Sequence, residues 1–336
     1  MKKRLLLQTA LAGAALLLTT AGSQAQSQVR ELRMGSPFPS SSHMYTGMQK
    51  FAEEVGKETQ GRFKVNVYAD SQIGGIPQLL TGMQLGTVDM ALIGIGVATS
   101  LKGGDPLSVA YVPYIFKSKQ AATDVLNGPL FTDIFEGIAN QSGVRLFVLD
   151  GARSPRAFQS TRGPIRKPED IRGMRVRVPQ VEMFRAMFEK LGVKAVQTGM
   201  SDIYTALSKG QVEAQDNGFD VSLNFKWHEV AKYWAATDHN FEPVGFYISD
   251  KLWKTLAPAD QAAFKKAGHA AGALITKLGN EVDRKGVEEL KSLGVTYTQP
   301  DLGPWRDALK DVHLPYEGKL WPAGMVERIR ALPENR

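Results

Sequence analysis

The chain has 336 residues, of which 41 are Lys or Arg and 34 are Asp or Glu, and it contains no cysteine. The lack of cysteine excludes a disulfide scaffold and a lipoprotein anchor, so a buried apolar core must stabilise the fold. The mild positive charge is dispersed among acidic residues, which argues against a nucleic-acid partner, and the length suggests about two domains.

The N-terminus has the pattern of a secretory signal peptide. Three cations, Lys2 to Arg4, precede an apolar run from Leu5 to Leu18, and small residues follow up to Ala25. We predict a signal peptide over residues 1–25, whose removal leaves an excess of four positive charges. The apolar run is too short for a membrane-spanning helix of about 20 residues. The sequence therefore predicts an exported protein without stable membrane insertion after signal cleavage.

The first half of the chain alternates between strand and helix patterns. In chain order, we predict a strand at 31–35, a helix ending near Gly61, a strand at 63–68, a helix at 76–85 and a strand at 88–93. The helices follow from apolar residues at spacings of three and four, and the strand at 63–68 from strict alternation. Such alternation predicts parallel strands connected by helices, and hence an α/β fold.

The same alternation continues beyond residue 93. We predict a helix at 118–139, strands at 144–149 and 174–178, a helix at 181–191, a strand at 193–196, a helix at 201–209 and one or two helices over 258–293. The stretch from Gly151 to Pro168, rich in Arg, Ser and Pro, indicates a crossing between two lobes. Ligands of open α/β sheets bind at the carboxyl ends of strands, and a cleft between two lobes is a natural pocket.

Two segments carry arginines where predicted strands begin or end. Arg153 and Arg156 follow the strand that ends at Leu149, whereas Arg175 and Arg177 share one face of a strand that stops at a proline. A planar guanidinium offers two parallel donors to a carboxylate, so these residues are candidates for binding a small acid. Solvated surface charge is the commoner role for such residues and stays open at this point.

Three segments have a distinctive order and spacing. They are KPEDIRGMRVRVP at 167–179, MSDIYTAL at 200–207 and GQVEAQDN at 210–217, and FAEEV, GRFKV, QIGG, GTVDM and VPYIF precede them. Together they resemble the solute-binding proteins of tripartite ATP-independent periplasmic (TRAP) transporters, of the C4-dicarboxylate-binding type. The resemblance covers nearly the whole chain after the signal peptide.

The resemblance implies a two-lobe periplasmic binding-protein fold. Each lobe is expected to be a mixed sheet flanked by helices, with the ligand cleft between the lobes and a long helix bridging both. Lobe I is expected over residues 26–152 plus about 243–283, and lobe II over about 153–242 plus 284–336. The resemblance also implies a periplasmic location, a small organic acid anion as ligand, and the TRAP membrane permease subunits as partners.

The resemblance also implies the main ligand contacts. An arginine matching Arg177 forms a salt bridge with the ligand carboxylate in this family, a second arginine matching Arg156 helps, and an asparagine matching Asn217 adds a hydrogen bond. Arg153 competes for the second role, because the segment could slip by three residues. The family's frequent Glu-Asn-Pro is Asp216-Asn217-Gly218 here, which leaves the neighbouring pocket wall open.

Weaker candidates complete the predicted pocket. His43 follows the first strand in a loop that often contributes contacts in the family, but it could equally cap the adjacent helix. Phe38 and Ile76 lie in comparable loops. Phe219 and Trp227 come soon after the asparagine and could cover the ligand, although aromatic residues at such positions are as often packing residues.

An enzyme is the weaker interpretation of the sequence. The five histidines contain no pair with metal-ligand spacing, and neither Ser154 nor Ser160 lies in a Gly-x-Ser-x-Gly turn. We therefore predict no catalytic residue, no cofactor and no metal ligand. A ligand-binding partner of a membrane sensor kinase would share the same pocket and stays an alternative. The expected ligand is a sugar acid, a hydroxy acid or a C4-dicarboxylate.

Overall fold

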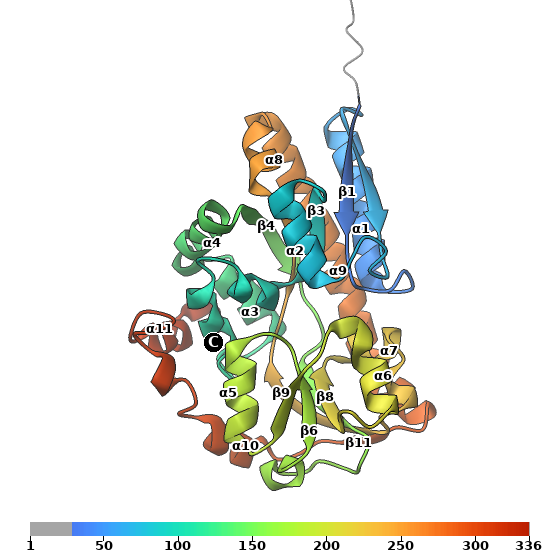
Figure 1. The fold of residues 1–336 in the computed structure, drawn as a ribbon, viewed down its shortest axis with the longest axis vertical. Coiled ribbons are helices and arrows are strands. Elements are labelled where there is room, and N and C mark those ends of the chain that lie inside the picture. Colours follow the sequence, from blue (N-terminus) through green and yellow to red (C-terminus); the bar gives the residue numbers. More distant parts are fainter. Residues whose placement is uncertain (1–28, 336) are drawn as a thin grey trace, which may run out of the picture.

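The computed structural model describes residues 29–335 of the chain (Figure 1). The predicted signal peptide, residues 1–25, lies outside these residues and stays a prediction. Within the described part of the chain, no helix combines the length and the apolar character that a membrane crossing requires.

Lobe I is the part of the molecule built on a five-stranded mixed sheet with strand order β2-β1-β3-β10-β4. Its strands are β1 (Arg30–Gly35), β2 (Phe63–Tyr68), β3 (Met90–Gly94), β4 (Val144–Gly151) and β10 (Val244–Ser249). β1 pairs in parallel with β2 and β3, whereas β10 runs antiparallel to β3 and β4. Both β3 and β10 are buried along their whole length, as expected for central strands with helices on both faces.

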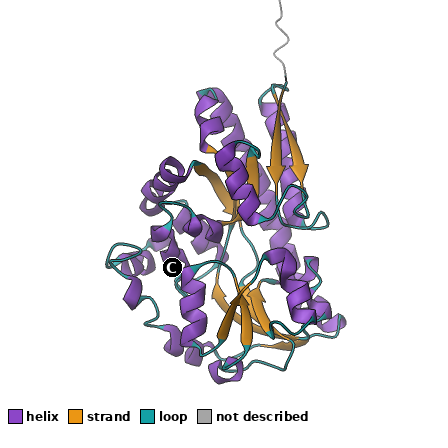
Figure 2. Ribbon diagram, viewed as in Figure 1, coloured by secondary structure: helices purple, strands orange, loops and turns teal. Residues whose placement is uncertain are grey.

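The helices of lobe I cover both faces of this sheet (Figure 2). They are α1 (His43–Glu58), α2 (Ile76–Leu85), α3 (Lys119–Leu126), α4 (Pro129–Ser142) and α8 (Asp250–Thr255), with 3-10 segments at Ile95–Ser100 and Asp105–Tyr111. Phe51 of α1 stacks on Phe246 of β10 with ring centroids 4.8 Å apart, and both rings are fully buried. Aromatic packing between α1 and the sheet therefore forms one centre of the lobe I core.

Lobe II is the part built on a six-stranded mixed sheet with strand order β11-β9-β5-β8-β6-β7. Its strands are β5 (Arg156–Ser160), β6 (Arg175–Val178), β7 (Lys194–Gln197), β8 (Ala214–Asn217), β9 (Tyr233–Asn240) and β11 (Thr296–Thr298). Its helices are α5 (Glu182–Lys190), α6 (Ile203–Ser208), α7 (Phe219–Asn224) and α10 (Leu302–Leu309), whereas α11 (Met325–Ala331) lies in the C-terminal segment that leads back to lobe I. Two mixed sheets flanked by helices confirm the predicted fold class.

One long helix connects the two lobes. α9 (Pro258–Ser292) has 35 residues, and Figure 1 shows it running from lobe I into lobe II. It packs on α1 and β4 in lobe I and on α7 and β11 in lobe II. Glycine permits this close approach, because a Cβ at Gly272 would lie 2.6 Å from Cβ of Asp150, at the end of β4.

The chain also crosses between the sheets in two short segments. Residues 152–155 connect β4 to β5, and residues 241–243 connect β9 to β10. The first crossing is shorter than the predicted stretch from Gly151 to Pro168, because β5 already begins at Arg156. The end of the chain returns to lobe I, where the side-chain amide of Asn335 donates to the carbonyl oxygen of Ile115 at 2.8 Å.

The helix predicted over residues 118–139 is wrong as a single element. The structure has two helices there, α3 and α4, separated at Gly128 and Pro129. Proline has no backbone N–H and clashes with the preceding turn, so it is tolerated in the first turn of a helix but not inside one. Pro129 therefore begins α4.

Candidate functional site

A cavity of about 890 Å³ lies between the lobes. Lobe I contributes the loop around Phe38, the start of α2 and the segment 94–102, whereas lobe II contributes the ends of β6, β7 and β8. The crossing segments add Arg153 and Glu242 to its lining. The volume falls in the range of about 300–1,000 Å³ that is typical of small-molecule sites.

Arg177 of β6 lines this cavity as a cation without an acidic partner. The residue is 6% exposed, and its Nε donates to the carbonyl oxygen of Thr198 at 2.9 Å. Within residues 29–335, no carboxylate lies within salt-bridge distance of its guanidinium. Burial, together with the nearby charge of Arg156, lowers the pKa of Arg177 to about 10, so it is still protonated at neutral pH. A buried cation beside an open cavity favours an anion supplied from outside.

Arg156 of β5 is equally buried but paired within the protein. Its Nε donates to Oδ2 of Asp216 at 2.7 Å, and Nη1 donates to Oε2 of Glu242 at 2.6 Å. Nη2 donates to the carbonyl oxygen of Asp216 at 2.8 Å. Burial opposes the charged form, but Asp216 and Glu242 outweigh it and raise the pKa of Arg156 above its ordinary value. Its guanidinium is therefore a fixed part of the cavity lining. We call the side formed by Arg153, Arg156 and Glu242 the cavity floor and the side formed by Arg177 the cavity wall.

Arg153, in the crossing at residues 152–155, shares Glu242 with Arg156. Its Nη1 donates to Oε2 of Glu242 at 3.0 Å, and Nη2 donates to Oδ1 of Asn217 at 3.3 Å. Its guanidinium carbon lies 5.5 Å from the ring centroid of Phe38, a cation–π arrangement. Both arginines that competed for the second role therefore line the cavity, together with Asn217.

Glu242, in the second crossing, is a cavity residue that sequence reasoning missed. Besides the two arginines, its carboxylate accepts from the hydroxyl of Tyr111 at 3.1 Å. Burial alone would raise the pKa of Glu242, but the charges of Arg156 and Arg153 outweigh it and hold the pKa below its ordinary value. Glycine at position 94 leaves room for this carboxylate, because a Cβ there would lie 2.7 Å from Oε1 of Glu242. The sequence did offer one indication that Glu242 lies near the cavity, because this residue is next to the predicted boundary between the lobes at 242/243.

Asp216 is a second buried acid that pairs with Arg156 but does not itself line the cavity. Its Oδ2 lies 3.2 Å from Nε2 of His239, in addition to its bond with Arg156. Burial would raise the pKa of Asp216, but Arg156 and His239 outweigh it and hold the pKa well below its ordinary value. Buried carboxylates thus balance Arg153 and Arg156, whereas Arg177 has no such partner among residues 29–335.

His43, at the start of α1, lies behind this floor and does not line the cavity. Its Nε2 lies 3.8 Å from Oδ2 of Asp220, and the same oxygen lies 3.8 Å from Nε of Arg153. The capping role considered for His43 is wrong, because the hydroxyl of Ser42 caps α1 by accepting from the backbone N–H of Tyr45. Burial, opposed by Asp220, lowers the pKa of His43.

The remaining candidates divide between cavity and core. Ile76 lines the cavity at the first turn of α2. Phe219 instead stacks on Trp234 with ring centroids 4.4 Å apart, and Trp227 is fully buried and stacks on Phe225. Neither Phe219 nor Trp227 lines the cavity, because the chain after Asn217 turns into α7 and directs these rings into the packing of lobe II. The prediction that they contact the ligand is therefore corrected.

The comparisons with known proteins agree with this geometry. The family model for bacterial extracellular solute-binding protein, family 7, matches residues 34–319. A solute-binding protein of Roseobacter denitrificans is 30% identical over 331 residues, which cover 97% of this chain and 96% of that protein.

Solved structures show the same architecture. A TRAP periplasmic solute-binding protein from Roseobacter denitrificans, with bound L-galactonate, is 28% identical with a TM-score of 0.81 and covers 90% of this chain and 99% of that one. One from a Polaromonas species, bound to D-erythronate, has a TM-score of 0.85 at 24% identity, with the same coverage of 90% and 99%. The chain therefore belongs to family 7 of the bacterial extracellular solute-binding proteins, the solute-binding proteins of TRAP transporters.

Proposed function

We propose that the protein captures a hydroxylated organic acid with a single carboxylate, such as a sugar acid, in the interlobe cavity and delivers it to a TRAP membrane permease. The observation that carries this proposal is Arg177, a buried cation on the cavity wall without an acidic partner in the described part of the chain. A ligand carboxylate would complete the ion pair through two parallel hydrogen bonds. Each charge-assisted hydrogen bond contributes about 1.5–3 kcal/mol.

The charges on the cavity floor favour one carboxylate over two. Glu242 and Asp216 already neutralise Arg153 and Arg156, so a second ligand carboxylate near the floor would meet the ionised side chain of Glu242. A ligand hydroxyl there could instead donate to Glu242 and accept from an arginine. This pattern supports a sugar acid over a C4-dicarboxylate, in keeping with the L-galactonate bound by the Roseobacter relative.

The proposed mechanism is closure of the lobes on the ligand. Arg177 and Thr198 come from lobe II, whereas Phe38 and Ile76 come from lobe I, so a ligand in the cavity contacts both lobes at once. Contacts made with both lobes only when they are closed shift the population toward the closed state. The closed form then docks on the permease and releases the acid on opening.

Thermal melting against a panel of acids tests the proposal. The mature protein is unfolded and refolded to remove any co-purified ligand, then melted with sugar acids, C4-dicarboxylates, neutral sugars and amino acids. A ligand at a hundred times its dissociation constant adds about 2.7 kcal/mol of stability. We expect a sugar acid or a related hydroxy acid to raise the melting temperature and to be recovered unchanged. A shift with dicarboxylates alone, or turnover of the acid, would contradict the proposal.

A further inference from the structure

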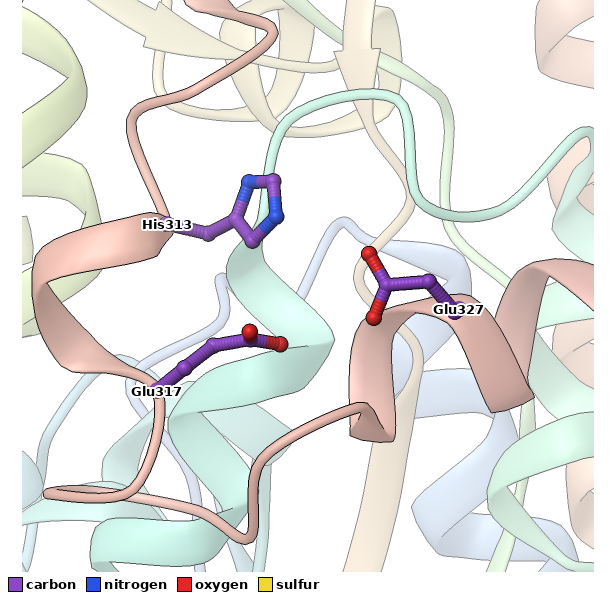
Figure 3. A group of neighbouring side chains, drawn as sticks. All are labelled: His313, Glu317 and Glu327. Atoms are coloured by element: carbon purple, nitrogen blue, oxygen red, sulfur yellow. The ribbon is translucent and has the colours of Figure 1, made fainter.

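A second polar cluster lies outside the cavity, in the segment between α10 and the C-terminus. It consists of His313, Glu317 and Glu327, and one potential ligand atom from each lies within 4.8 Å of the other two. His313 and Glu317 flank a short 3-10 turn (Leu314–Tyr316), and Glu327 comes from α11. Figure 3 shows the two carboxylates and the imidazole ring directed toward a common space.

The imidazole of His313 is buried without a hydrogen-bond partner. The residue is 3% exposed, and within residues 29–335 neither of its ring nitrogens has a partner. Oε1 of Glu317 is buried and unpartnered in the same way. Leaving a buried polar atom unsatisfied costs about 1–3 kcal/mol, so such groups call for a partner that completes them.

We infer that His313, Glu317 and Glu327 bind a divalent transition-metal ion, with Zn²⁺ the best chemical match. Imidazole nitrogen and carboxylate oxygen are both zinc ligands, and a zinc ion held by three protein ligands keeps a fourth position for water. Calcium and magnesium prefer sites made of oxygen alone, so the histidine selects against them.

The geometry requires only a small contraction. Zinc–ligand bonds of about 2.0–2.2 Å place tetrahedral ligand atoms roughly 3.5 Å apart, closer than the observed limit of 4.8 Å. Glu327 is exposed and can rotate toward the other two groups.

A metal ion there would fasten the connection between the two lobes at the C-terminus. α10 packs on α5 of lobe II, and the turn after α11 packs on α3 of lobe I, where Asn335 accepts from the backbone N–H of Lys117 at 3.1 Å. The cluster lies in the chain between these two attachments. Binding the ion would therefore order the segment 313–327 without touching the solute cavity.

Calorimetric titration of the chelator-treated mature protein with Zn²⁺ tests the inference. The protein carries no polyhistidine tag, and the buffer contains no organic acid. We expect one saturable site per chain, weakened roughly tenfold or more in Glu327→Gln and lost in His313→Asn. Glu327 is exposed, so Glu327→Gln should fold even if the histidine variant does not.

Two control variants remove similar groups elsewhere. Glu334→Gln changes another exposed glutamate near the C-terminus, and His269→Gln changes an exposed histidine on α9, and both should bind Zn²⁺ like the wild type. The absence of saturable binding, or equal affinity in the wild type and Glu327→Gln, would overturn the site. Stronger binding of Ca²⁺ than of Zn²⁺ would overturn the proposed metal class. None of these results bears on the solute cavity.

Discussion

The floor and the wall of the interlobe cavity each hold a buried arginine, but among residues 29–335 only the arginine on the floor pairs with acids. Arg156 on the floor is 3% exposed and makes three hydrogen bonds to protein oxygens, two of which belong to carboxylates. Arg177 on the wall is 6% exposed and donates to the carbonyl oxygen of Thr198. Burial alone therefore does not distinguish an arginine that is paired within the protein from the one that we propose binds the ligand. The distinction lies in whether the protein supplies the counter-ion.

Replacing each arginine by methionine should separate their roles most clearly in a measurement of stability. Arg156→Met leaves Asp216 and Glu242 buried without their main cation, and breaking a buried pair in this way costs about 3–5 kcal/mol. Arg177→Met leaves no carboxylate of residues 29–335 without its cation, so the free energy of unfolding of this variant should stay within about 1 kcal/mol of the wild type. Urea denaturation followed by circular dichroism measures both. Equal losses would show that the two arginines have the same structural role.

The complementary measurement is ligand affinity. Arg177→Ala should weaken binding of the acid identified by melting about a hundredfold or more, because it removes two charge-assisted hydrogen bonds that each contribute about 1.5–3 kcal/mol. Arg175→Ala is the matched control, since Arg175 lies on the same strand with its side chain 45% exposed. Calorimetry should find the control unchanged. Unaltered affinity in Arg177→Ala would remove the central contact of the proposed site.

The pH dependence of stability tests the two acids that pair with Arg156. A carboxylate whose pKa is lower in the folded protein than in the unfolded chain stabilises the fold at pH values above its unfolded pKa. This stabilisation is lost as the pH falls through its folded pKa. Glu242 and Asp216 both have pKa values below their ordinary 4.5 and 3.8.

The melting temperature should therefore fall as the pH drops below about 4.5, and less steeply in Glu242→Gln than in the wild type. Melting curves between pH 7 and pH 3 measure the difference. The same slope in both proteins would mean that Glu242 is not held ionised by the arginines.

The smallest expected effect concerns selectivity. Glu242→Gln removes one counter-ion from Arg153 and Arg156, so the affinity for a C4-dicarboxylate should rise about tenfold relative to that for a sugar acid, a change of about 1.4 kcal/mol. Asp202→Asn is the control, because Asp202 also lines the cavity and, in the described structure, pairs with no arginine. Competition binding measures the ratio. An equal change in both variants would indicate a general effect of charge.

Sequence patterns predicted much of lobe I, and β6 and β7 of lobe II, but missed several other strands. The strand at 63–68 and the helix at 76–85 match β2 and α2 residue for residue, because one face of each element is apolar and the other polar. No strand was predicted at β5, β8, β9 or β10. β5, β8 and β10 are buried on both faces, so their sequences show no alternation.

The cavity residues divide in a similar way. Arg177, Arg156, Asn217 and Ile76 lie on segments with a recognisable order, and the structure brings all four to the cavity. Glu242 has no partner nearby in sequence, so only the fold could join it to two arginines. Trp227 was misplaced because an aromatic residue after a strand end fits a ligand cover and a core position equally well.

The bridging helix α9 places a constraint on how this chain can change during evolution. Each residue of an α-helix adds a rotation of about 100° and a rise of about 1.5 Å. Since the first half of α9 packs on lobe I and its second half on lobe II, inserting one residue between Gly272 and Gly286 would turn one lobe about 100° relative to the other. Substitutions in this stretch can be absorbed one contact at a time, whereas insertions and deletions cannot. The length of α9 should therefore vary less among relatives than its sequence.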